Sequence, residues 1–92
     1  MFYKKGDKVV IDDKKIIKEY QEVIKVEKDT EMKKFFQKEL RKFRKYMKQQ
    51  KEKKKPFIIK DWMWESPETL CMYYLIGHWY MKEDNIIRMQ KD

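Results

Sequence analysis

Large apolar residues recur every three or four positions between residues 32 and 47, and this period constrains the fold more than any other feature. The series is Met32, Phe35, Phe36, Leu40, Phe43 and Met47. At about 100° per residue these side chains cover roughly 140° of a helix circumference, which makes one core-facing side. The spacing predicts a helix over about residues 30–54, with Asp29 or Thr30 as its N-cap and Pro56 ending it.

The opposite side of this predicted helix carries a stripe of cations. Five side chains fall within roughly 80° of the circumference: Lys34, Lys38, Arg41, Lys45 and Lys48. A solvated helix face usually alternates charge signs, whereas these like charges repel one another. An anionic partner would relieve the repulsion. We therefore expect the stripe, with the neighbouring Arg44 and Lys51, to bind a partner; a merely solvated face is the alternative.

The net charge of the chain is concentrated in the same segment. Residues 31–55 hold twelve Lys or Arg and three Asp or Glu, a net +9, whereas residues 1–30 net +1 and residues 56–92 net −2. A lysine-rich composition inherited from an AT-rich genome would not place the excess in one segment. The run Lys53–Lys55 also suits the negative end of a helix dipole, so a capping role stays open for it.

Residues on either side of this segment predict one further helix and several strands. Residues 13–26 carry apolar side chains at helical spacing behind the possible N-caps Asp12 and Asp13. Residues 8–11 are β-branched and follow a turn at Gly6. After Pro56 the pattern changes to short strands separated by turns, and we expect strands over residues 57–64, 70–76, 78–80 and 86–89.

This order of elements resembles the small SH3-like barrel proteins that many phages and mobile elements encode. The matching residues are Gly6, Asp7 and Val9 in the opening strand, and Gly77, Trp79, Tyr80, Glu83, Asp84 and Ile86 near the end. The resemblance implies an α+β protein with a small SH3-like antiparallel β-barrel or sheet and a two-helix insertion. It also implies a scaffold without shared catalytic residues.

At 92 residues we expect a single domain. Its parts are a first strand in residues 1–12, a helical insertion in residues 13–55 and antiparallel strands in residues 56–92. The predicted 25-residue helix is roughly 37 Å long, more than a small barrel covers. We expect its overhang to seed a homodimer or a helical hairpin with residues 13–26.

Trp62 and Trp64 share a parity and would face the same side of a strand. They could join other rings in a platform that stacks nucleic-acid bases; these rings are Tyr73, Tyr74, Trp79 and Tyr80. The alternative, which we favour for most of the rings, is that they fill the core. One or two exposed rings would then serve as partner contacts.

No pattern in the sequence predicts catalysis, a metal site or a cofactor. His78 is the single histidine, and Cys71 lies in an apolar run that favours a buried position. Adjacent Asp12 and Asp13 suit helix capping better than metal binding. We therefore expect a protein that is not an enzyme, and a cytoplasmic one, since no apolar run reaches the ~18 residues of a membrane span.

Two functions fit these features. The first is a binder of nucleic acid or of a ribonucleoprotein that lays the basic helix along phosphates. The second is a phage or mobile-element inhibitor of a host defence machine, of the anti-CRISPR type, that grips an acidic protein surface within the host cell. A membrane surface is a weaker candidate, because core packing is the simpler use of the apolar helix face.

Overall fold

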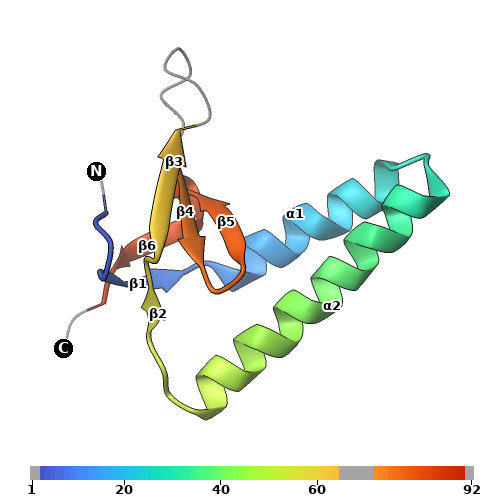
Figure 1. Cartoon of the computed structure of the whole chain (residues 1–92). Helices are drawn as coiled ribbons and strands as arrows, with labels where there is room; N and C mark the ends of the chain where they lie inside the picture. Colours follow the sequence, from blue (N-terminus) through green and yellow to red (C-terminus); the bar gives the residue numbers. More distant parts are fainter. Residues whose placement is uncertain (1–2, 65–71, 91–92) are drawn as a thin grey trace. The chain divides into compact units, whose positions relative to one another are not determined.

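A computed structural model of the chain describes residues 3–64 and 72–90. The chain divides into two compact units, one formed by residues 1–12 with 56–92 and the other by residues 13–55. The first unit holds the strands and the second holds the two helices (Figure 1). The single domain expected from chain length stays a prediction.

The helical unit is a hairpin of α1 (Asp13–Val26) and α2 (Thr30–Glu52), which pack against each other. Figure 1 shows them running side by side from a short connection. Between them the rings of Tyr20 and Phe43 lie 6.2 Å apart. The predicted helices and the predicted helical hairpin are confirmed.

Both ends of α2 are fixed by local hydrogen bonds. At the start, the Asp29 carboxylate accepts from the backbone N–H groups of Glu31 at 2.9 Å and Met32 at 3.2 Å, so Asp29 is the N-cap. At the end, the N–H of Lys55 donates to the Gln50 carbonyl at 3.0 Å and that of Lys54 to the Lys51 carbonyl at 3.2 Å. Lys54 has φ 53°, the left-handed geometry of a Schellman cap that usually favours glycine.

The strand unit contains two antiparallel three-stranded sheets. The first has the order β2-β1-β6, from β2 (Phe57–Ile58), β1 (Lys8–Ile11) and β6 (Ile86–Met89). The second has the order β3-β4-β5, from β3 (Asp61–Trp64), β4 (Met72–Ile76) and β5 (Trp79–Lys82). A short 3₁₀ turn, η1 (Glu83–Asn85), joins β5 to β6.

The prediction of one continuous strand over residues 57–64 is wrong. The Ile59 N–H donates to the Asp7 carbonyl at 2.9 Å, beside the first sheet, and the next N–H, that of Lys60, donates to the Leu75 carbonyl at 2.8 Å on β4. The chain thus passes from one sheet to the other at these two residues. Ile59 is fully buried at this crossing.

The α+β class with antiparallel strands is confirmed. The strands among the described residues form two separate sheets and do not close a barrel. Gly77, with φ 63°, makes a tight turn between β4 and β5. The turn expected between the predicted strands 57–64 and 70–76 lies outside the described residues, as do the first two residues of the second of these strands.

Buried apolar side chains from both sheets form the core of the strand unit. Val9, Tyr74 and Ile76 have no exposed surface. The Tyr74 hydroxyl accepts the backbone N–H of Tyr3 at 3.2 Å, and the two rings meet edge to face at 5.3 Å. Burial raises the pKa of the Tyr74 hydroxyl, and the hydrogen bond from the Tyr3 N–H partly opposes this rise.

Candidate anion-binding surface

The cationic stripe consists of five exposed side chains on α2: Lys34, Lys38, Arg41, Lys45 and Lys48. At 1.5 Å per residue it extends about 21 Å along the helix. Leu40, Phe43 and Met47 are buried on the opposite side. Because these three residues fix which way the helix faces, the stripe points to solvent along its whole length.

Within the described part of the chain, none of the five stripe cations has an ion-pair partner. Nearby cations on α2 differ in this respect. The Lys42 ammonium lies 3.7 Å from the Glu39 carboxylate, and the Lys51 ammonium lies 2.7 Å from that of Asp13. The stripe therefore carries uncompensated positive charge, whereas the charges of Lys42 and Lys51 beside it are partly neutralised.

Arg44 and Lys51, which the sequence assigned to the same surface, border the stripe at a shallow, open groove. Two residues of α1, Asp13 and Ile17, line this groove, and α2 contributes Arg44, Met47, Lys48, Lys51 and Glu52. The Lys51 ammonium donates a 2.7 Å hydrogen bond to the Asp13 carboxylate. Lys51 therefore helps to join α2 to α1. Arg44 is exposed and remains a candidate contact beside the stripe.

The apolar side of α2 is buried over only part of its length. Leu40, Phe43 and Met47 are buried as predicted, but Met32 and Phe35 are exposed. The prediction that these two residues belong to the core is therefore wrong. Periodicity reports which side of a helix is apolar, whereas burial depends on how far other elements extend along it.

Trp62 and Trp64 lie on β3, and both are exposed, with 42% and 39% of their surface accessible. Their rings meet edge to face at 6.4 Å, which confirms that they share a side of the strand. Tyr80 is also exposed, whereas Tyr74 is fully buried. The remaining predicted platform rings, Tyr73 and Trp79, are half-buried.

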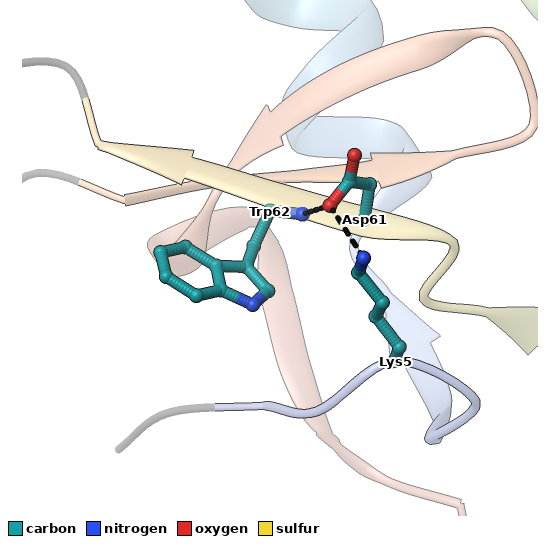
Figure 2. A network of polar contacts seen from close by, with 3 residues as sticks. All are labelled: Lys5, Asp61 and Trp62. Carbon is teal, nitrogen blue, oxygen red and sulfur yellow. Dashed lines mark hydrogen bonds and ion pairs between the residues drawn. The ribbon is translucent and has the colours of Figure 1, made fainter.

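A polar contact fixes the start of β3 beside these rings (Figure 2). The Asp61 carboxylate accepts the backbone N–H of Trp62 at 2.9 Å and lies 3.4 Å from the Lys5 ammonium. The hydrogen bond from Trp62, together with Lys5, lowers the pKa of Asp61. Lys5 therefore forms an ion pair with a carboxylate of its own unit.

The other residues singled out in the sequence do not converge on a site. His78 is exposed in the turn between β4 and β5, with its ring 5.9 Å from that of Trp79. Asp13 lies in the first turn of α1 and pairs with Lys51, Asp12 precedes that helix, and Cys71 lies outside the described residues. Over residues 3–64 and 72–90, no group of three His, Cys, Asp or Glu side chains is placed to hold a metal ion.

Neither described helix combines the length and apolar content that crossing a bilayer requires. No protein-family model, no curated protein and no solved structure matches the chain.

Proposed function

We propose that the chain is a non-enzymatic binding protein that lays the cationic stripe of α2 along the phosphates of a nucleic acid, free or within a nucleic acid–protein complex. The observation that carries the proposal is five exposed cations with no carboxylate partner among the described residues. Such a row releases condensed counterions when it meets a phosphate backbone, which drives binding.

The stripe residues suit recognition of the backbone more than recognition of bases. Four of the five are lysines, which act on phosphates as compact point charges. Phosphate contacts fix register and orientation without reading sequence. We therefore propose binding with little base preference.

We propose that the strand unit is a small SH3-like scaffold of mobile-element origin, as the resemblance of the sequence implies. In support, β1 pairs with both β2 and the last strand β6, and the chain runs from β2 directly into the second sheet. Glu83 and Asp84, two of the residues that carry the resemblance, lie in η1 directly before the last strand. Strands that pass between sheets in this way make the corners of orthogonal β packings.

The direct test is charge reversal on the stripe with a matched control on α1. Lys38→Glu, Arg41→Glu and Lys45→Glu together should weaken binding of a fluorescent duplex DNA, or of an RNA duplex, by roughly a hundredfold or more in an anisotropy titration. The control combines Lys14→Glu, Lys18→Glu and Lys25→Glu, all exposed on α1. It changes the net charge equally, so an equal loss in both variants would show that only total charge matters and would contradict the proposal.

A second candidate, a protein-binding inhibitor of a host defence machine, is favoured by the exposed pair Trp62 and Trp64. Tryptophan is enriched among the residues that dominate protein interfaces. The surrounding strand unit has a net charge of −1, so this pair does not share the cationic character of α2. Capture of a host protein that survives nuclease treatment, and that Trp62→Ala with Trp64→Ala abolishes, would establish this function.

A further inference from the structure

The apolar side chains of the helical hairpin become more exposed toward the connection between the helices. On α2, Phe43 is fully buried, whereas Met32 is 43% exposed. On α1, Ile16 is 6% exposed, whereas Val23 is 40% exposed although it lies on the same side of the helix. The core-facing sides of both helices therefore continue past the buried part.

We call residues 22–35 the hairpin tip. Four large apolar side chains of the tip are exposed: Val23, Val26, Met32 and Phe35. Single exposed apolar residues are common on protein surfaces, but a group of this kind marks a contact site. All the exposed large apolar residues described in the helical unit lie within this segment.

The charges around the tip are balanced, which favours a partner of mixed charge. Residues 22–34 contain four acidic residues and four lysines, a net charge of zero, whereas residues 35–55 carry a net +8. Although Lys34 also belongs to the stripe, the tip as a whole has no net charge, so an anionic partner is attracted mainly to the rest of α2. A surface that carries both signs around an apolar centre can pair with a copy of itself about a two-fold axis.

We propose that the hairpin tip is a dimerisation surface and that its partner is the tip of a second copy of this chain. Two hairpins that meet in this way would form a short four-helix contact, which buries the exposed parts of both apolar sides.

The dimer leaves most of the cationic stripe available, because all of its residues except Lys34 lie outside the tip. On α2, Met32 lies roughly 160° around the helix from the centre of the stripe. Two copies joined at their tips therefore expose two stripes, and the dimer could hold two nucleic-acid segments. The dimer itself does not depend on the proposed function, because its contacts are apolar.

Dimerisation and nucleic-acid binding should respond to salt in opposite directions. Each copy has a net charge of +8, so two copies repel each other, and added salt screens that repulsion. Dimerisation should therefore strengthen as salt rises from about 0.1 M to about 1 M, whereas binding to nucleic acid should weaken over the same range.

Sedimentation equilibrium of the whole chain, without nucleic acid, tests the proposal. We expect a monomer–dimer equilibrium that Met32→Glu with Phe35→Glu shifts by at least roughly tenfold toward monomer. The matched control is Gln37→Glu with Gln49→Glu, which adds the same charge at exposed positions of α2 outside the tip and should not shift the equilibrium toward monomer. Circular dichroism of each variant checks that the helices remain folded.

Two results would overturn the proposal. One is a wild-type chain that sediments as a monomer at every concentration and salt tested. The other is a dimer that the tip variant and the control weaken equally. Co-sedimentation of a monomeric wild-type chain with phosphatidylserine vesicles, lost in the tip variant, would assign the tip to a lipid surface instead.

Discussion

α1 and α2 both have one apolar side, but they differ in how much positive charge they carry. Each turns an apolar side inward, with Ile16 buried on α1 and Phe43 buried on α2. α1 holds four lysines and three acidic residues, whereas α2 holds nine Lys or Arg and three acidic residues. Packing of a helical hairpin requires the apolar sides and not the excess charge. Under the proposed function, the outer side of α2 would serve a partner, while that of α1 would serve solubility.

The largest expected effect concerns the side that the helices share. Phe43→Ala should destabilise the chain by about 3–5 kcal/mol, because it removes a fully buried ring and leaves a cavity. Phe35→Ala removes the same group from an exposed position and should cost less than about 1 kcal/mol in dilute solution. Urea unfolding followed by circular dichroism measures both. Equal losses would show that burial along α2 is uniform.

A smaller effect concerns the start of α2. Asp29→Ala removes the carboxylate that accepts two backbone N–H groups and should cost about 1 kcal/mol. Thr30→Ala is the control, because the sequence left both residues open as the N-cap. Thermal unfolding of the two variants distinguishes them, and a greater loss from Thr30→Ala would contradict the observed cap.

At the other end of α2 we expect a gain in stability. Lys54→Gly should stabilise the chain by about 0.5–1 kcal/mol, because glycine adopts positive φ without the steric cost that lysine meets. Lys53 has φ −85°, so Lys53→Gly should destabilise. Both variants lose one lysine, and urea unfolding compares them at equal charge. If both moved stability in the same direction, backbone geometry would not be the cause.

The smallest effect compares a tyrosine on each helix at high pH. Burial raises the pKa of Tyr20, and the Glu39 carboxylate raises it further. Burial also raises the pKa of Tyr46, but a hydrogen bond that Gln50 donates to its hydroxyl opposes this rise. The folded chain thus holds these protons more tightly than the unfolded chain. Their contribution to stability is complete below pH about 10 and is lost as the pH rises through the folded pKa values.

Titration of tyrosinate absorbance tests the assignment of causes. Glu39→Gln should lower the pKa of Tyr20 toward its ordinary value and leave that of Tyr46 unchanged, with Tyr20→Phe and Tyr46→Phe identifying each transition. A shift of both tyrosines would mean that the substitution loosens the hairpin as a whole.

Local signals made much of the fold predictable. The helices, the strand at residues 8–11 and the end of α2 before Pro56 follow from apolar period, β-branched content and capping residues that act within a few positions. The cationic stripe was predictable for the same reason, since helix geometry alone places its side chains. The stripe is exposed because Phe43, on the opposite side of α2, is buried.

The features that could not be predicted from the sequence depend on contacts between residues far apart in the chain. The break at Ile59 depends on carbonyls of Asp7 and Leu75 that lie far away in the chain. The pairing of Lys51 with Asp13 joins residues 38 positions apart. Likewise, the exposure of Met32 depends on where other elements end. The predicted helix overhang was the one sequence signal that pointed to an uncovered tip.

The salt dependence of binding tests the central claim most directly. Five phosphate contacts predict that the logarithm of the affinity of the wild-type chain for duplex DNA falls against the logarithm of salt concentration with a slope of roughly −4 to −5. A flat dependence in an anisotropy titration would contradict the assignment of the α2 stripe to a phosphate backbone.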